Sequence, residues 1–166
     1  GSGDPKLTFE QFWLLLRQLR ARGVREIRGD LVLDRSAFAG ISHDEAAFDN
    51  KPLRPYNVGP DALLLNFKAV RLTLAPENGR ILVLAEPAPA NLDIVNLLKP
   101  GSGACPPGSE WREALRADIS RHGDSFRLVL TGSYPTACGE QKWNIGLLGH
   151  PQYVLGVFRQ LWAELG

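Results

Sequence analysis

The sequence predicts an α+β fold, in which a helix-flanked α/β domain carries a small antiparallel β domain inserted into it. Two observations lead to this prediction. Apolar residues recur with the helical period near both ends of the chain, and a period of two runs through the middle. We therefore expect residues 1–65 and 141–166 to form one discontinuous α/β accessory domain, and residues 66–140 to form the inserted all-β domain.

The composition is that of an ordinary soluble globular protein. The chain has 166 residues, of which 44% are hydrophobic and 22% charged, so a core of useful size can form. The net charge of +1 gives no strong attraction to nucleic acid or to an anionic membrane. No apolar run approaches the roughly 18 to 20 residues of a membrane span. The opening GSGDPK lacks the apolar core of a signal peptide, so we expect a cytosolic chain or a fragment of something larger.

The first predicted helix begins at Thr8, since Thr8 and Gln11 have the spacing of a capping box. Gly23 is placed to end it with a left-handed residue. The residues expected to face a core are Phe9, Phe12, Trp13, Leu16 and Leu19.

A strand is expected next, at about Ile27 to Leu33, with Leu31–Leu33 buried and packing both terminal helices on one sheet. Residues 39–61 follow with little periodicity and three prolines. Loops this long inside a compact domain are uncommon and are often functional.

The middle of the chain reads as five to six short strands, which is typical of a small antiparallel β module. Asn78 and Gly79 give the strongest hairpin signal. The expected strands are 63–74, 81–84, 92–97, 111–119, 126–131 and 142–147. A last helix follows, with Pro151 in its first turn.

The two cysteines, Cys105 and Cys138, lie in segments rich in Pro, Gly and Ser. Two unrelated thiols are one interpretation. We favour the other, a disulfide closing a loop of about 33 residues, which by chain entropy adds roughly 3 to 4 kcal/mol. A disulfide also indicates an oxidising compartment.

The sequence contains no motif of a serine acyl-enzyme of the penicillin-binding class. No serine is followed three residues later by Lys, and neither Ser-x-Asn nor Lys-Thr-Gly occurs. His122, Asp124 and Ser125 carry the residue types of a triad, but within four residues they cannot line up in series, so we predict a polar turn. The sequence therefore predicts no catalytic residue and no cofactor in this chain.

A metal site is also not expected. The residues His43, Asp44, Glu45 and Asp49 lie close together, but their spacing matches no known metal-binding loop. A single cysteine pair is likewise too few ligands.

Several motifs together resemble one family over nearly the whole chain. They are Gly3-Asp4-Pro5-Lys6-Leu7, Gly23-Val24-x-x-Ile27-x-Gly29-Asp30-Leu31-Val32-Leu33-Asp34 with Ser36 and Phe38, Arg54-Pro55-Tyr56-Asn57-Val58-Gly59-Pro60-Asp61-Ala62-Leu63 and Gly132-x-Tyr134-Pro135-x-x-Cys138-Gly139. This sequence resembles penicillin-binding proteins of the D-alanyl-D-alanine carboxypeptidase/endopeptidase type, the penicillin-binding protein 4 group of peptidase family S13. Lys6 departs from the family pattern, which has Thr there.

The resemblance implies a non-catalytic insertion in a periplasmic serine peptidase that acts on peptidoglycan. In that family the region lies between Ser-x-x-Lys and Ser-x-Asn and folds as two nested domains. The implied partners are the catalytic domain of the same parent chain and, through it, the peptidoglycan stem peptide, with neither nucleic acid nor a membrane span involved.

The resemblance also names two substrate-contact candidates. In the family, the loop after the opening strand lines the catalytic groove, where an acidic residue and an aromatic residue contact the diamino acid of the stem peptide. The best matching positions are Asp49 and Tyr56. The alternative function is a self-standing β-rich module that binds a protein or a glycan, and an independent hydrolase is the weakest hypothesis.

Overall fold

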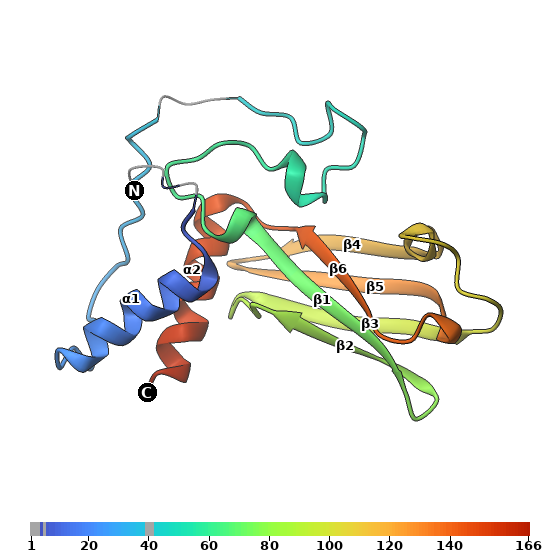
Figure 1. Cartoon of the computed structure of the whole chain (residues 1–166). Coiled ribbons are helices and arrows are strands. Elements are labelled where there is room, and N and C mark those ends of the chain that lie inside the picture. The colour runs from blue at the N-terminus through green and yellow to red at the C-terminus, as the bar shows by residue number, and fades with distance from the viewer. Residues whose placement is uncertain (1–3, 5, 39–41) are drawn as a thin grey trace. The chain divides into compact units, whose positions relative to one another are not determined.

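A computed structural model describes residues 4, 6–38 and 42–166, and its mixture of helices and strands is the α+β class that the sequence predicts (Figure 1). The elements are α1 (Phe9–Ala21), β1 (Ala69–Glu77), β2 (Arg80–Glu86), β3 (Leu92–Gly101), β4 (Leu115–His122), β5 (Ser125–Pro135), β6 (Gln141–Gly146) and α2 (His150–Glu164). None of the helices in the described ranges is long and apolar enough to cross a membrane.

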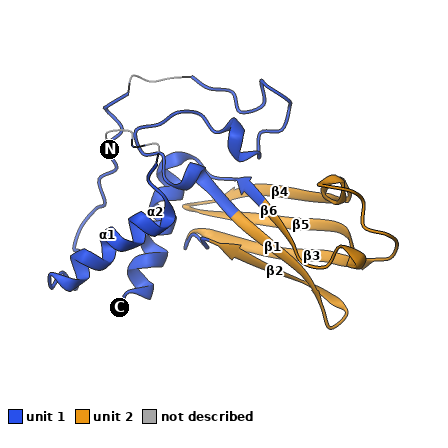
Figure 2. Cartoon of the chain, in the orientation of Figure 1, with its two compact units in different colours: residues 1–70, 87–90, 144–166 blue, residues 71–86, 91–143 orange. Residues whose placement is uncertain are grey.

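The chain forms two compact units, coloured separately in Figure 2. The first consists of residues 1–70, 87–90 and 144–166, and the second of residues 71–86 and 91–143. Within the motifs that carry the resemblance, Gly3 and Pro5 lie outside the described residues, as does the start of the loop at 39–41.

Helix α1 begins and ends as the sequence predicts. The Thr8 amide donates to Gln11 Oε1 at 3.0 Å, and the Gln11 amide donates to Thr8 Oγ1 at 3.4 Å, which completes the capping box. Gly23 ends the helix with φ of +90°. The guanidinium of Arg20 then lies 3.7 Å from the centroid of the Trp162 ring and donates to the Trp162 carbonyl at 2.8 Å, which joins α1 to α2.

The prediction of a buried strand at 27–33 is wrong. Residues 24–34 belong to no strand, and Val32 is 84% exposed. A strand is stable only when its backbone groups pair with a neighbour, and the described sheets are built entirely from β1 to β6. The aliphatic residues Leu31–Leu33 favour burial, but their pattern does not provide a neighbouring strand whose backbone could pair with theirs. The helices α1 and α2 consequently contact each other directly rather than through this segment.

The strand expected at 63–74 also begins later than predicted, at Ala69. The residues before it, Asn66, Phe67 and Lys68, have φ values of +47°, +52° and +53°. Left-handed backbone cannot continue a pleated strand, so these residues form a tight turn instead. Tyr153 of α2 holds this turn, since its hydroxyl donates to the Ala69 carbonyl at 2.8 Å.

The strands form two three-stranded sheets, in the orders β2-β1-β6 and β3-β5-β4. The hairpin at Asn78 and Gly79 is confirmed, because both residues have the positive φ that a type I′ turn requires, +49° and +75°. Strand β4 begins at Leu115, later than the strand expected at 111–119, because the 3-10 helix Glu110–Ala114 occupies the first part of that segment.

The second sheet departs from the expected antiparallel arrangement. Strands β3 and β5 pair in parallel, with Leu92 opposite Phe126, whereas β4 and β5 pair antiparallel. The reason is the connection between β3 and β5. It contains β4, which runs back along β5 and returns the chain to the end at which β3 began.

The second unit has a packed aromatic and aliphatic core. Trp111 lies edge-to-face against Tyr134, with ring centroids 5.5 Å apart, and against Trp143 at 6.5 Å. Gly132 has φ of +117°, and a Cβ there would lie 2.2 Å from the Ala114 carbonyl oxygen, so only glycine fits. The aliphatic residues that are fully buried in the same unit are Leu72, Leu74, Leu128 and Leu130.

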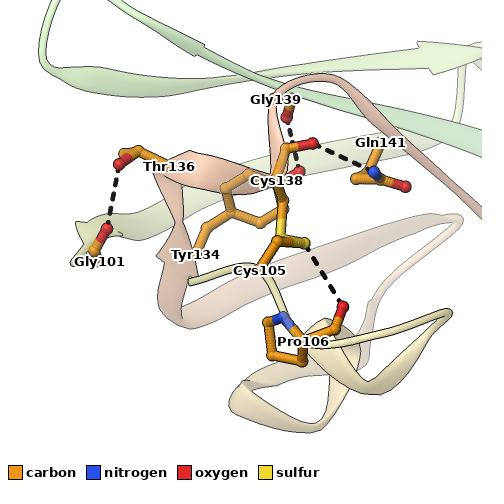
Figure 3. The surroundings of a disulfide bond; sticks show 8 residues. All are labelled: Gly101, Cys105, Pro106, Tyr134, Thr136, Cys138, Gly139 and Gln141. Atoms are coloured by element: carbon orange, nitrogen blue, oxygen red, sulfur yellow. Dashed lines mark hydrogen bonds between the residues drawn. A yellow bond between two sulfur atoms is a disulfide. The ribbon is translucent and has the colours of Figure 1, made fainter. Parts of the chain in front are cut away.

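The disulfide expected between Cys105 and Cys138 is present in the structure (Figure 3). It joins the segment after β3 to the 3-10 turn after β5. Around it, the Tyr134 hydroxyl donates to the Gly139 carbonyl at 2.8 Å, and Thr136 Oγ1 donates to the Gly101 carbonyl at 3.2 Å. The ends of the parallel pair β3 and β5 are therefore fastened covalently and by hydrogen bonds.

Candidate functional site

The loop that precedes β1 forms an open cavity of about 330 Å³ at its surface. The described residues that line it come from one stretch of the first unit, between residues 43 and 57. They are His43, Asp44, Ala47, Phe48, Tyr56 and Asn57.

The structure brings together the two residues that the resemblance singles out. The Tyr56 hydroxyl donates to Asp49 Oδ2 at 2.5 Å. Asn57, which is buried, donates from Nδ2 to the other oxygen, Asp49 Oδ1, at 2.7 Å, and the Lys51 amide donates to Oδ1 at 3.1 Å. Both carboxylate oxygens are therefore held in place, and two of the side chains that hold them, Tyr56 and Asn57, line the cavity.

The electrostatics of this pair keep Asp49 charged. The hydrogen bond from Tyr56 is the main reason why the pKa of Asp49 lies below its ordinary value, and the same bond raises the pKa of Tyr56. At neutral pH the pair is a carboxylate beside a protonated phenol. A carboxylate beside aromatic rings can bind an organic cation, and Tyr56 and Phe48 are 64% and 84% exposed.

The other side of the cavity depends on a glycine that the sequence analysis did not single out. His43 Nε2 lies 2.7 Å from the Asn57 carbonyl oxygen, and the His43 ring packs over Gly59. A Cβ at Gly59 would lie only 2.7 Å from a ring carbon of His43. His43, which the sequence offers as one of several possible but unmatched metal ligands, lines the cavity instead. Across the described ranges, no group of three or more His, Cys, Asp or Glu could hold a metal ion.

An ion pair fastens the C-terminal end of this loop at Asp61, which we call its far end. Arg35 Nε donates to both carboxylate oxygens of Asp61, at 3.1 and 2.9 Å, and the Leu63 amide donates to Oδ1 at 2.8 Å. Burial raises the pKa of Asp61, but the hydrogen bonds from Arg35 and Leu63 outweigh burial, so the pKa lies below its ordinary value.

A second ion pair fastens the N-terminal part of the loop at Glu45, which we call its near end. The Lys68 ammonium lies 2.5 Å from Glu45 Oε1, and Lys68 is buried. Neither ion pair was predicted, since Arg35 and Asp61, like Glu45 and Lys68, are more than 20 residues apart in the sequence.

His150, the first residue of α2, lies within the electrostatic influence of both ion pairs. Burial lowers the pKa of His150, an effect that the carboxylate of Asp61 opposes. Its Nδ1 atom is buried and has no hydrogen-bond partner among the described residues. His150 is not among the described residues that line the cavity.

Comparison with known proteins supports the resemblance found in the sequence. The family model described as "D-Ala-D-Ala carboxypeptidase 3 (S13) family" matches residues 1–166. This chain belongs to that family. Among curated proteins, it is similar to "D-alanyl-D-alanine carboxypeptidase DacB" of Haemophilus influenzae, with 51% identity over 43 residues, which are 26% of this chain and 9% of the relative.

Two solved structures share the fold. Penicillin binding protein 4 (dacB) from Haemophilus influenzae matches with a TM-score of 0.67 and 20% identity, over 99% of this chain and 35% of the other. The same protein complexed with a β-lactam matches with a TM-score of 0.55 and 18% identity, over 99% and 33%. The chain of this S13-family member thus spans about a third of the length of the solved relatives.

Proposed function

We propose that this chain is the non-catalytic insertion region of a longer serine D-Ala-D-Ala carboxypeptidase/endopeptidase, which works in the periplasm on peptidoglycan. Its membership of the S13 family supports this proposal, as does the share of the solved relative that it spans. The sequence supports it too, because Ser-x-x-Lys, Ser-x-Asn and Lys-Thr-Gly do not occur in it. The region would shape substrate access for the catalytic domain of the same parent chain.

The contact between Asp49 and Tyr56 is the observation that carries the more specific proposal. The resemblance assigns to these positions the recognition of the diamino acid in the stem peptide. A side-chain ammonium group suits a carboxylate held at 2.5 Å from a phenol, and the exposed Phe48 lines the same cavity as Tyr56. Catalysis is not part of this proposal, since a carboxylate and aromatic rings bind a cation without attacking a carbonyl.

Calorimetric titration of the chain with a stem tripeptide tests this role. A tripeptide ending in a diamino acid should bind, and the same tripeptide with norleucine in that position should bind at least about tenfold more weakly, because it lacks the ammonium group. Asp49→Asn should remove most of this difference. Asp93→Asn is the matched control, since Asp93 forms an exposed ion pair with Arg127 in the second unit. Equal affinity for the two tripeptides would refute the proposed recognition.

Incubation with a labelled penicillin tests the absence of catalysis. We expect no covalent label on this chain, because a serine nucleophile of this class needs the Lys of Ser-x-x-Lys beside it. A label on any of its serines would show that the nucleophile lies within the chain.

One observation favours the alternative, a binding module for a protein or a glycan. Leu82 and Leu84 on β2 and Leu97 on β3 are exposed. The Asn96 side chain donates to the Ile81 carbonyl at 2.7 Å, which brings β2 and β3 together beside these leucines. A ligand that binds with unchanged affinity to the Asp49→Asn variant but not to a Leu84→Asp variant would favour this alternative.

A further inference from the structure

We propose that Lys68 is a positioning residue for the cavity, and that the strained turn at residues 66–68 exists to hold its ammonium group against Glu45. This inference rests on the function proposed for Asp49 and Tyr56, and it assigns the element that keeps those residues in place.

Burial of Lys68 makes its contact with Glu45 obligatory. Lys68 is 5% exposed, and its Nζ atom donates to Glu45 Oε1. A buried ammonium group is costly unless a charged partner is hydrogen-bonded to it. Any movement that withdraws Glu45 from this position therefore leaves an uncompensated charge, and the near end of the loop is held.

Glu45 transmits this restraint directly to the cavity. Its neighbour Asp44 lines the cavity, and so do Ala47 and Phe48 a few residues further on. The Asp44 side chain also accepts from the Ala46 amide at 2.8 Å, which makes residues 44–46 a compact turn. The position of Glu45 thus sets the position of the wall that carries Phe48, and Asp49 follows next in the chain.

The backbone around Lys68 shows that its position is maintained at a cost. Asn66, Phe67 and Lys68 are three successive residues other than glycine with positive φ. Such backbone strain persists only where the surroundings enforce it, and it concentrates at functional positions.

Several contacts enforce this turn. The Asn66 amide donates to the Leu7 carbonyl at 2.8 Å, and Asn66 Nδ2 donates to the Ala69 carbonyl at 3.1 Å. Tyr153, fully buried in α2, donates to the same Ala69 carbonyl. The turn is therefore anchored to α2 and to the residue that precedes the cap of α1, and both anchors lie in the same unit as the cavity.

The ion pair at the far end of the loop is a natural comparison. Each pair has one side chain that is 6% exposed, Asp61 at the far end and Lys68 at the near end. The partners differ, since Arg35 is 48% exposed and Glu45 is 31% exposed, so water can replace Arg35 more readily than it can replace Glu45. We therefore expect the Lys68 pair to control the loop more strongly than the Arg35 pair does.

Hydrogen exchange in the full-length polypeptide that contains these residues tests this proposal. In Lys68→Met, amides in residues 43–57 should exchange about tenfold faster or more, whereas amides in β5 should be unchanged, because only the loop loses its restraint. Lys68→Arg should restore most of the protection. The matched control, Arg127→Met, removes an exposed ion pair in the second unit and should leave residues 43–57 unchanged.

Glu45→Gln provides a second approach in case Lys68→Met does not fold, because Glu45 is partly exposed and its substitution leaves the turn at 66–68 intact. It should loosen residues 43–57 and weaken binding of the diamino-acid tripeptide by a similar factor. Unchanged exchange at 43–57 in a folded variant of either residue would overturn the proposal, as would a uniform rise in exchange across both units. If Lys68→Met loosens the loop while Asp49→Asn leaves tripeptide affinity unchanged, the positioning role stands and the proposed function fails.

Discussion

The core of the second unit and the loop that forms the cavity are held by different kinds of interaction. In the second unit, fully buried leucines, a tryptophan packed against Tyr134 and a disulfide fix the strands. In residues 42–61, side chains bind backbone and other side chains, with Asp49, Asn57 and Asp61 each accepting or donating several hydrogen bonds. Apolar burial is not directional, whereas hydrogen bonds fix positions, so the polar loop is the region suited to recognise a ligand.

The largest expected effect comes from truncating a leucine on the apolar side of this comparison. Leu128 in β5 is fully buried, so Leu128→Ala should lower the free energy of unfolding by about 3 to 5 kcal/mol, through lost burial and the cavity left behind. Leu84→Ala is the control, since Leu84 is 57% exposed and its truncation should cost under about 0.5 kcal/mol. Urea denaturation measures both values, and equal losses would contradict the assignment of Leu128 to the core.

Removal of the disulfide should have the next largest effect. Cys105→Ser combined with Cys138→Ser frees a loop with a sequence separation of 33, and should cost roughly 3 to 4 kcal/mol in the chain-entropy model. Thermal unfolding with and without a reductant measures the loss. Tripeptide binding should be unchanged at temperatures where the variant stays folded, because the cavity lies in the other unit. A loss of binding in the folded variant would mean that the two regions are not independent.

A methyl group at Gly59 should disturb the polar region with a smaller effect on stability. Gly59→Ala forces the His43 ring away from its place over residue 59, which also breaks the contact between His43 and the Asn57 carbonyl. We expect a loss of about 1 to 3 kcal/mol, the usual cost of overpacking, together with weaker tripeptide binding. Gly79→Ala changes a glycine of the hairpin that has no atoms nearby, and its backbone strain should destabilise the chain without affecting binding.

The pH dependence of stability should show the smallest effect. Because burial lowers the pKa of His150, the unfolded state binds a proton at a higher pH than the folded state does. The contribution of His150 is therefore fully present above its ordinary pKa of about 6.5 and is lost as the pH falls below that value. His150→Asn should flatten the stability curve between about pH 6.5 and 5, as urea titrations at each pH would show. An unchanged slope would contradict the effect of burial on His150.

Local signals in the sequence predicted those parts of the fold that depend on neighbouring residues. Thr8 and Gln11 cap α1 because three residues separate them, and Asn78 with Gly79 forms its hairpin from backbone preferences alone. The prediction of a strand at 27–33 failed because aliphatic periodicity does not reveal whether a neighbouring strand exists to pair with it. The turn at 66–68 was missed for a related reason, since it is enforced by Tyr153, 87 residues beyond Asn66.

The candidate site, like the fold, could be predicted only in part. Asp49 and Tyr56 could be named from the resemblance, and seven residues of separation allow the contact that the structure contains. The side chains that support them could not be named, because Lys68 and Asp61 carry no local signal of burial. Charged residues are usually exposed, so a sequence pattern predicts Lys68 and Asp61 at the surface. Only the folded structure shows the distant partners that allow them to be buried.

The division of the chain into units has a consequence for how such regions can be exchanged between genes. The chain passes from one unit to the other after residues 70, 86, 90 and 143. The short return at 87–90 is bonded to the first unit, where the Ala90 amide donates to the Gly156 carbonyl of α2 at 3.0 Å. A recombination event that replaced residues 71–143 as one cassette would also remove this bond from the first unit. Intact transfer of the second unit would therefore require the incoming segment to carry its own equivalent of residues 87–90.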